Sequence, residues 1–506
     1  MRNFVLIYVN GQRHELRGPR LFQSLSDFLR YELQLTGTKV VCAEGDCGSC
    51  TVFLGRPRGG AIEYRTVCSC IQYLYQLDGC HIVTVEGLKY DGQMNPIQSA
   101  MVRCQGTQCG FCTPGFVVSM CALFEGDGPI TEHRLRRGLI GNLCRCTGYE
   151  PILKAGLAID ASQVKRLDEL YPPAPLLLAL APASNDAVLV QDSDRTFFKP
   201  TSIADAARFK QEHADCVIIS GGTDLGVQMN KGVRALRTVM STAALEPLRE
   251  LSVSNEQIVA GASVSIAELE NAAAKALPEY AALLGWFGSP PIKNAGTVGG
   301  NIANASPIGD SMPAMFVLNA EIELTGVNDS RRVNINSFYT GYKKSVATAD
   351  ELITRVFIPL PKVGEVFKLY KVSKRKDLDI SSFTAAVWMS VSDHTIGEVR
   401  IAYGGVAATI VRLPKTEAAL NGQRISEALF DDAADVAVGE IKPISDVRGS
   451  ADYRLRLAAN VLRKFFIETF GGGSNGDGRG PNGDGNGHPP THAKSRLSAL
   501  DVVVRK

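Results

Sequence analysis

The amino-acid sequence predicts a multidomain protein of the α+β class. Its 506 residues suffice for about three to five domains. Three features divide the chain: all but one of its 13 cysteines precede residue 147, strand-like and helical stretches alternate after residue 195, and a Gly/Asn-rich segment begins at residue 471. We therefore expect folded regions over residues 1–87, 88–165, 195–362 and 366–470, with a linker over 166–194 and a flexible tail over 471–506.

The composition excludes two broad classes of function. The formal net charge is +2, from 54 basic and 52 acidic residues, so there is no electrostatic footprint for nucleic acid or an anionic membrane. No apolar run reaches the roughly 18–20 residues that a membrane span needs. The first residues predict a strand and an Asn10-Gly11 hairpin turn rather than an export signal. We therefore expect a cytoplasmic protein, in which cysteines serve as metal ligands rather than in disulfides.

The first region carries a cysteine triplet of specific spacing. Its sequence, Cys42-x4-Cys47-x2-Cys50, has the plant-type ferredoxin spacing. A single loop of this kind can wrap a two-iron cluster and present three thiolates to it. Gly45 and Gly48 permit the backbone conformations and the close approach that such a loop needs.

The fourth thiolate must come from outside that loop. Both Cys68 and Cys70 stand on a following strand-like segment, and spacing alone allows either of them. A structural zinc site is the alternative for the whole group, although zinc sites seldom use the x4–x2 triplet.

A second cysteine group follows in the helical region. Cys109 and Cys112 form a C-x2-C pair, and Cys144 and Cys146 form a C-x-C pair. Each pair stands just before an expected helix, and Pro114 suits a first helical turn. Two helix N-termini would direct their positive dipole ends at an anionic cluster. By spacing alone, four cysteines could also hold zinc.

Two glycine-rich segments in the third region offer backbone N–H groups and small hydroxyls to a pyrophosphate. They are residues 217–224 and 294–301, and the plain alternative for each is an ordinary turn. A letter-for-letter dinucleotide fingerprint, Gly471-x-Gly473-x-x-Gly476, follows a helix rather than a strand and lies in the low-complexity tail. We therefore reject it.

At these motifs the sequence resembles the xanthine oxidase family of molybdenum hydroxylases. The resemblance lies in residues 35–50, 108–115 and 141–149 around the cysteines, and in residues 221–224, 294–302 and 305–310 further on. It implies a β-grasp ferredoxin-like domain, a four-helix-bundle [2Fe–2S] domain, an FAD-binding α/β domain of the vanillyl-alcohol-oxidase type and an α+β flavoprotein C-terminal domain, in the order of the four regions.

The same resemblance implies the cofactors and their ligands. Two [2Fe–2S] clusters are expected, one on Cys42, Cys47, Cys50 and Cys70 and the other on Cys109, Cys112, Cys144 and Cys146. Gln108 matches a glutamine that contacts the pterin, and residues 374–379 resemble a loop that sets flavin electrostatics and access of NAD. The residues expected to bind FAD are Val217, Ile218, Ile219, Ser220, Gly221, Gly222, Thr223, Asp224, Phe287, Thr297, Val298, Gly299, Gly300, Asn301, Asp310 and Lys371.

The implied function is electron transfer in the small subunit of a two-subunit xanthine dehydrogenase. Electrons from xanthine or hypoxanthine hydroxylation would pass through both clusters to FAD and then to NAD+. The molybdopterin and the catalytic carboxylate would lie on a large partner subunit, in an (αβ)2 heterotetramer, so no catalytic residue is expected in this chain. The alternatives are the same relay serving another N-heterocycle or aldehyde hydroxylase, a zinc-stabilised FAD scaffold, and a stand-alone NADH:acceptor reductase.

Overall fold

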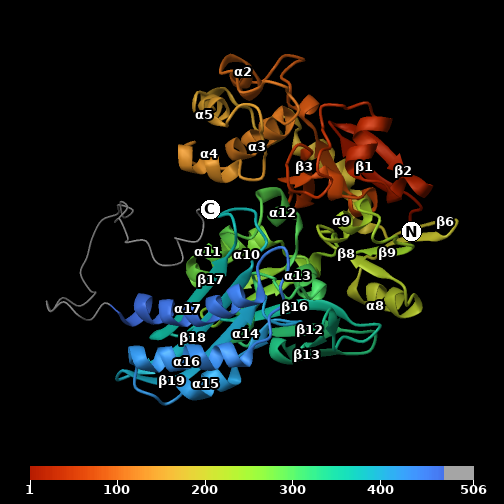
Figure 1. The fold of residues 1–506 in the computed structure, drawn as a ribbon. Helices are drawn as coiled ribbons and strands as arrows, with labels where there is room; N and C mark the ends of the chain where they lie inside the picture. Colours follow the sequence, from red (N-terminus) through yellow and green to blue (C-terminus); the bar gives the residue numbers. More distant parts are fainter. Residues whose placement is uncertain (472–506) are drawn as a thin grey trace.

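The computed structural model describes residues 1–471, so the predicted tail lies outside the described residues except for Gly471. Figure 1 shows the two cysteine-rich domains stacked above the rest of the chain, with the C-terminal domain at the opposite end. Of the helices in residues 1–471, none is both long and apolar enough to cross a membrane.

The first domain is the predicted β-grasp fold. Its five-stranded sheet has the order β2-β1-β5-β3-β4, in which β1 and β5 are parallel and the other neighbours antiparallel. Asn10 and Gly11 both have positive φ, 49° and 81°, as the predicted β1–β2 hairpin turn requires. Its elements are β1 (Val5–Val9), β2 (Gln12–Leu16), α1 (Leu25–Asp27), β3 (Thr51–Arg58), β4 (Ala61–Cys68) and β5 (Cys80–Val83).

The second domain is the predicted bundle of four helices. Capping side chains define two of the helix starts: Asn95 accepts from the backbone N–H of Gln98, and Thr131 accepts from that of Arg134. The helices are α2 (Pro96–Arg103), α3 (Thr113–Glu125), α4 (Glu132–Gly138) and α5 (Glu150–Leu157).

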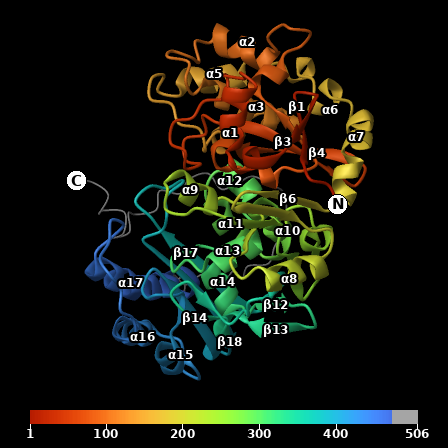
Figure 2. The same cartoon turned by 90° about the vertical axis from the view of Figure 1, so that its right-hand side faces the viewer.

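The segment predicted as a linker, 166–194, is largely regular structure. It forms α6 (Leu167–Leu170), α7 (Pro173–Asn185) and β6 (Val188–Asp192), which run down the side of the molecule between the upper and lower domains (Figure 2). Leu176 and Leu180 of α7 are buried. Arg2 also forms an isolated parallel β-bridge with Val188 of β6. The Pro/Ala-rich composition predicted an exposed linker. Instead, the apolar side chains of this segment pack against the neighbouring domains, because this removes them from water.

The third region contains two larger sheets, several helices and the small two-stranded β14-β15 sheet. The first, in the order β6-β7-β9-β8, is parallel except for β6, and the second, β10-β11-β16-β12-β13, is antiparallel. The elements after β6 are β7 (Arg195–Lys199), α8 (Ile203–Glu212), β8 (Val217–Ile219), α9 (Leu225–Asn230), β9 (Thr238–Ser241), β10 (Leu251–Val253), β11 (Gln257–Gly261), α10 (Ile266–Ala276), α11 (Pro278–Gly285), α12 (Pro290–Ala295), α13 (Val298–Asn304), α14 (Met312–Val317), β12 (Glu321–Thr325), β13 (Ser330–Asn334), β14 (Tyr339–Gly341), β15 (Lys344–Ser345) and β16 (Leu352–Pro359).

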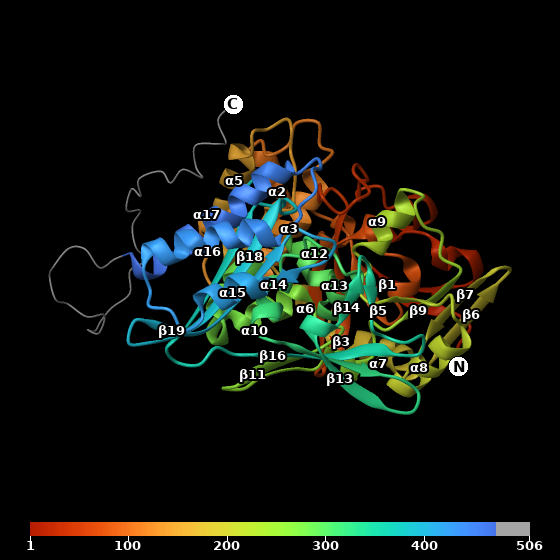
Figure 3. The same ribbon diagram turned by 60° about the horizontal axis from the view of Figure 1, so that its bottom comes forward.

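The fourth region is an antiparallel sheet covered by helices. In Figure 3, α16 and α17 lie across the sheet that contains β18. The sheet order is β17-β18-β19-β20. The elements are β17 (Glu365–Val372), β18 (Phe383–Ser392), β19 (Thr395–Gly404), β20 (Val411–Arg412), α15 (Pro414–Leu420), α16 (Glu427–Glu440) and α17 (Ala451–Phe470).

Hydrophobic cores cross the domain boundaries. The ferredoxin-like sheet shares one buried cluster with the β6–β9 sheet, for example through Val5, Ile82, Phe197 and Val239. Apolar burial of this kind stabilises the packing of the two domains by about 25 cal/mol per Å² removed from water. The first domain is therefore held firmly against the region that carries the glycine-rich segments.

Candidate functional site

The first thiol group gathers at one end of the ferredoxin-like sheet. Cys42 and Cys47 lie in the loop before β3, Cys50 directly precedes β3, and Cys70 lies in the 3-10 turn Ser69–Ile71 after β4. The Cys42 thiol lies beside those of Cys47 and Cys70, and the Cys50 thiol also lies beside that of Cys70. The fold therefore brings together the four cysteines that the resemblance assigns to one cluster.

The position of Cys68 differs from that of Cys70. The Cys70 thiol lies near those of both Cys42 and Cys50, whereas the Cys68 thiol lies near that of Cys50 and donates to the carbonyl oxygen of Gly45 at 3.6 Å. Only Cys70 lies between the two ends of the triplet loop. This geometry favours Cys70 as the fourth ligand.

The loop backbone has the shape that an anionic cluster needs. Gly45 and Gly48 have φ of 77° and 67°, which a side chain would strain. A Cβ on Gly45 would also lie 2.7 Å from Ile71 Cδ1 and 2.8 Å from Ile292 Cδ1, so the loop packs closely against its neighbours. The Cys42 sulfur accepts hydrogen bonds from the backbone N–H groups of Glu44 and Cys47, both at 3.4 Å.

The second thiol group forms two pairs. The Sγ atoms of Cys109 and Cys146 are 3.5 Å apart, and the thiol of Cys112 lies beside that of Cys144. Burial, followed by the hydrogen bond to Cys144, raises the pKa of Cys112 to about 12. Such a thiol ionises at neutral pH only when a metal centre stabilises the thiolate, so metal binding here would release protons.

Paired thiols suit a two-iron cluster, in which each iron takes two thiolates. Within residues 1–471, no three His, Cys, Asp or Glu side chains surround one point as the ligands of a single metal ion would. The paired thiols of the second site therefore fit a [2Fe–2S] cluster.

The two cysteine sites touch each other through backbone. The N–H of Leu143 donates to the carbonyl of Cys47 at 3.0 Å, and Asn142 Nδ2 donates to the carbonyl of Gly48 at 3.2 Å. A Cβ on Gly115 would lie 2.1 Å from the Gly48 carbonyl oxygen, so the approach depends on glycine. Phe111 and Leu143 are exposed beside the second site, as are Cys109 and Cys146.

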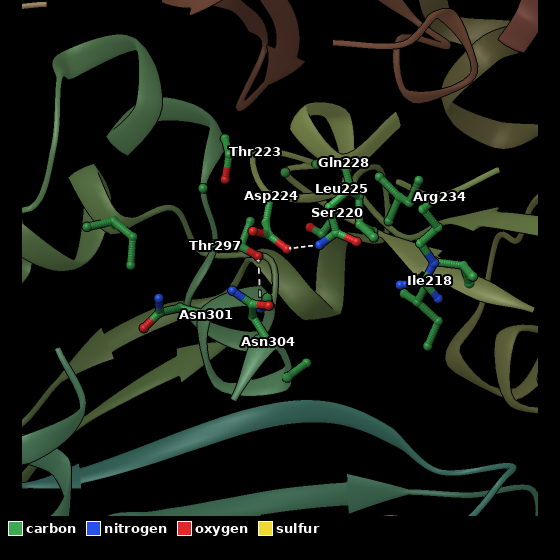
Figure 4. A pocket seen from close by; sticks show the side chains of 18 of the residues that line it. Ile218, Ser220, Thr223, Asp224, Leu225, Gln228, Arg234, Thr297, Asn301 and Asn304 are labelled. Atoms are coloured by element: carbon green, nitrogen blue, oxygen red, sulfur yellow. Dashed lines mark hydrogen bonds between the residues drawn. The ribbon is translucent and has the colours of Figure 1, made fainter. Parts of the chain in front are cut away.

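The glycine-rich segments meet at a cavity of about 520 Å³ between the β8–α9 turn and the start of α13. A Cβ on Gly221 would lie 1.9 Å from the carbonyl oxygen of Ala295, so the two segments approach each other more closely than any side chain permits. Thr297 caps α13, where its Oγ1 accepts from the Gly300 N–H at 3.1 Å (Figure 4). The cavity thus has the glycine-rich backbone and the hydroxyls that suit a pyrophosphate.

Most of the predicted FAD residues line this cavity. They are Val217, Ile218, Ile219, Ser220, Gly221, Gly222, Thr223, Asp224, Phe287, Thr297, Gly300 and Asn301.

Four of the predicted residues lie elsewhere. Val298 is buried, and a Cβ on Gly299 would lie 2.6 Å from the Cβ of Ala262, so both face the core behind the turn. Lys371 donates to Asp310 at 2.5 Å and to the carbonyl of Trp286 at 3.0 Å, which fixes the backbone beside Phe287. Asp310 and Lys371 therefore support the cavity wall rather than line this cavity.

Two cations line this cavity that no sequence motif indicated. Arg234 follows α9, and Lys343 lies in the β14–β15 turn, about 110 residues further along the chain. Both are cations on the cavity wall, the side-chain type that pairs with a diphosphate. The other lining residues absent from the prediction are Leu225, Gln228, Ile266, Gly296, Ala303 and Asn304.

A second cavity, of about 670 Å³, shares Thr223, Asp224 and Phe287 with the first. One wall is formed by residues 44–46 of the triplet loop, and another by Lys374, Arg375, Leu378 and Asp379. The loop predicted to set flavin electrostatics is held by an Arg375–Asp379 ion pair. The bundle domain also reaches this loop, because Arg137 of α4 pairs with Asp377 at 3.3 Å.

Comparison with known proteins agrees with this architecture. Residues 84–157 match the "[2Fe-2S] binding domain", residues 192–361 the "FAD binding domain in molybdopterin dehydrogenase", and residues 368–469 the "CO dehydrogenase flavoprotein C-terminal domain". Together with the paired thiols and the dinucleotide cavity, these matches define an iron–sulfur flavoprotein.

Relatives of known function are similar over most of this chain. Xanthine dehydrogenase 1 of Arabidopsis thaliana is 29% identical over 91% of this chain and 39% of its own length, and the xanthine dehydrogenase/oxidase of Gallus gallus is 27% identical over 92% and 40%. The chain thus spans about two fifths of the length of these relatives. Two carbon monoxide dehydrogenase structures share the fold of about half of this chain. The structure from Hydrogenophaga pseudoflava is 26% identical, with a TM-score of 0.51, and the match covers 53% of this chain and 94% of that one. The structure from Oligotropha carboxidovorans is 28% identical, with a TM-score of 0.51, and the match covers 54% and 96%. The chain carries [2Fe–2S] and FAD-binding domains similar to those of molybdenum hydroxylases.

Proposed function

We propose that this chain is an electron relay that connects a molybdenum centre on a partner chain with NAD+. One observation carries the proposal: the cavity that contains Thr223, Asp224 and Phe287 is bounded directly by residues 44–46 of the first cysteine loop. The two thiol sites are in backbone contact as well. The candidate sites therefore form an uninterrupted series through the protein.

The proposed ligands follow from the thiol pairs and the cavity lining. The first cluster would be held by Cys42, Cys47, Cys50 and Cys70, and the second by Cys109, Cys112, Cys144 and Cys146. FAD would lie on residues 217–224 and 297–301, beside Phe287. When bound, these groups supply single-electron carriers and a two-electron store.

The role of the chain itself is to place and shield these groups. The N–H groups of Glu44 and Cys47 direct hydrogen bonds at the Cys42 sulfur, and such bonds raise a cluster potential. Burial of Cys50 and Cys70 excludes water from the first site. The Arg375–Asp379 pair holds the loop at residues 374–379 beside the second cavity, where it would control the approach of NAD.

The partner and the substrate are part of the same proposal. The exposed Cys109 and Cys146 edge, with Phe111 and Leu143, would face a molybdopterin-binding large subunit in an (αβ)2 heterotetramer. The relatives named xanthine dehydrogenase support xanthine or hypoxanthine as the substrate of that assembly. The carbon monoxide dehydrogenase structures support the second candidate, the same relay serving a hydroxylase with another substrate.

The proposal is tested on the purified chain by its absorption spectrum and its iron, sulfide, zinc and flavin content. We expect about four irons and one FAD per chain, as two two-iron clusters require. NADH should reduce the flavin, whereas xanthine should have no effect until a molybdenum subunit is added. Zinc in place of iron, or the absence of flavin, would refute the relay. Reduction by another hydroxylase substrate in the assembled complex would favour the second candidate.

A further inference from the structure

The segment that follows Cys70 reaches out of its own domain into the candidate FAD site. Gln72 Nε2 donates to the carbonyl oxygen of Gly221 at 3.1 Å, and Gln76 Nε2 donates to that of Ser220 at 3.4 Å. Both glutamines are 3% exposed. The glycine turn that lines the FAD cavity is therefore held from behind by the ferredoxin-like domain.

These two hydrogen bonds determine where the turn directs its N–H groups. In a trans peptide the carbonyl of one residue and the N–H of the next point in opposite directions. Gln76 holds the carbonyl of Ser220, and Gln72 holds that of Gly221, on one side of the turn. The N–H groups of Gly221 and Gly222 therefore point to the other side, toward the cavity. Correctly aimed N–H groups are what a turn offers to a pyrophosphate.

Close packing transmits the position of this segment to the turn. A Cβ on Gly222 would lie 2.6 Å from Gln76 Nε2, and a Cβ on Gly226 would lie 2.5 Å from the carbonyl oxygen of Ile71. The turn and the start of α9 thus rest directly on residues 71–76. A shift of that segment cannot occur without a shift of the turn.

A second connection runs from the end of α9 back to the cysteines. Asn230 Nδ2 donates to the carbonyls of Ala43 and Cys70, both at 2.8 Å, and its Oδ1 accepts from the Tyr73 hydroxyl at 2.9 Å. Ala43 adjoins Cys42 and has a φ of 54°, a conformation that is strained for a residue with a side chain. One side chain from the FAD-binding region therefore fixes two backbone segments that carry proposed cluster ligands.

We propose that Gln72 and Asn230 are positioning residues that couple loading of the first cluster to binding of FAD. The inference rests on the proposed function, because it takes the cluster ligands and the FAD cavity from there. A cluster on Cys42 and Cys70 orders residues 70–76, and this order presents the N–H groups of the glycine turn to FAD. By linkage, bound FAD stabilises the cluster by the same factor.

The test uses the full-length chain with both clusters, and measures the FAD dissociation constant from flavin fluorescence. Gln72→Leu keeps the volume and removes the donor, and we expect it to weaken FAD binding about tenfold. Asn230→Ala removes an exposed side chain together with its hydrogen bonds to Ala43, Cys70 and Tyr73, and we expect it to weaken FAD binding about threefold. Arg58→Met is the matched control, because it breaks an ion pair between the same two domains, with Glu268, and touches neither the glycine turn nor the cysteine loop.

If the cluster favours FAD binding, FAD must equally favour retention of the cluster. The rate of iron release with and without FAD is therefore a second measurement, and a merely structural role of Gln72 would not change it. Removing FAD from the unmodified chain should speed the release of iron from the first site to a chelator about tenfold, as followed by the signal of that cluster in electron paramagnetic resonance. In Gln72→Leu this dependence on FAD should largely disappear.

The outcomes separate this inference from the function on which it rests. If the unmodified chain takes up neither iron nor FAD, the proposed function itself fails. If it takes up both, and Gln72→Leu and Asn230→Ala bind FAD as tightly as Arg58→Met, the coupling is refuted. Iron release that does not depend on FAD in the unmodified chain would also refute it.

Discussion

The contact between the two cysteine domains can be tested by one methyl group. Gly115 is the third residue of α3, three positions after Cys112. A Cβ at this position would lie 2.1 Å from the carbonyl oxygen of Gly48, in the loop that carries the first three cysteines. Both atoms belong to backbone or are fixed to it, so neither can rotate away. Gly115→Ala therefore forces the two domains apart.

The size of the effect follows from the contacts that are lost. A carbon–oxygen contact of about 3.3 Å is needed, so the domains must separate by about 1 Å. That movement weakens the bonds from Leu143 to Cys47 and from Asn142 to Gly48, which contribute about 1 kcal/mol each. Overpacking adds about 1–3 kcal/mol, and the better helix propensity of alanine returns about 1 kcal/mol. We expect a net destabilisation of about 2–4 kcal/mol.

The assay is urea unfolding of the iron-loaded chain, followed by helical circular dichroism and by the loss of cluster absorbance. Gly439→Ala is the matched control, since Gly439 also lies in a helix, α16, and its Cβ would meet no atom within 4 Å. We expect this control to raise stability by about 0.5–1 kcal/mol. If Gly115→Ala is as stable as Gly439→Ala and retains its clusters, the glycine contact between the domains is not as close as the structure shows.

Three further predictions concern other parts of the chain. Gly221→Ala should abolish FAD binding with little loss of iron, because its Cβ would lie 1.9 Å from the carbonyl oxygen of Ala295; unchanged flavin content would contradict this. Arg454→Met should destabilise the C-terminal domain by about 3 kcal/mol in thermal unfolding, because it leaves the carbonyls of Ser382 and Ile444 without their donor and removes the ion pair with Asp446. Burial raises the pKa of Glu125 to about 7, so the native state binds the proton more tightly than the unfolded state does. The contribution of this carboxyl group to the free energy of unfolding therefore falls as pH rises from about 4.5 to 7. Glu125→Gln should remove this slope and be more stable than the unmodified chain at pH 8 by about 1–2 kcal/mol, after allowance for solvent screening; equal melting temperatures at pH 5 and pH 8 in both proteins would refute it.

The broad architecture could be predicted because its signals are local in the sequence. The Asn10-Gly11 turn needs two positive φ values, which these residues tolerate best, and the structure has them. The confinement of cysteines to the first two regions, and the alternation of strands and helices after them, predicted the multidomain α+β class that the fold and the comparisons show.

The candidate site was less accessible to sequence reasoning. Spacing could not choose between Cys68 and Cys70, because both stand near the end of one strand; the choice depends on which thiol lies between Cys42 and Cys50. Likewise the glycine-rich segments indicated a phosphate turn, but Arg234 and Lys343 carry no motif, and only the folding of distant elements around one cavity places them there.

The sequence by itself determined the kinds of sites in this protein, since thiol spacing and glycine turns depend on a few neighbouring residues whose conformational limits are known. Tertiary structure alone decided how the sites are connected. Gln72 reaches a carbonyl 149 positions away, and Asn230 spans 187 positions to Ala43. Such contacts arise from the packing of whole domains against a shared hydrophobic core, and no local pattern of residues records them.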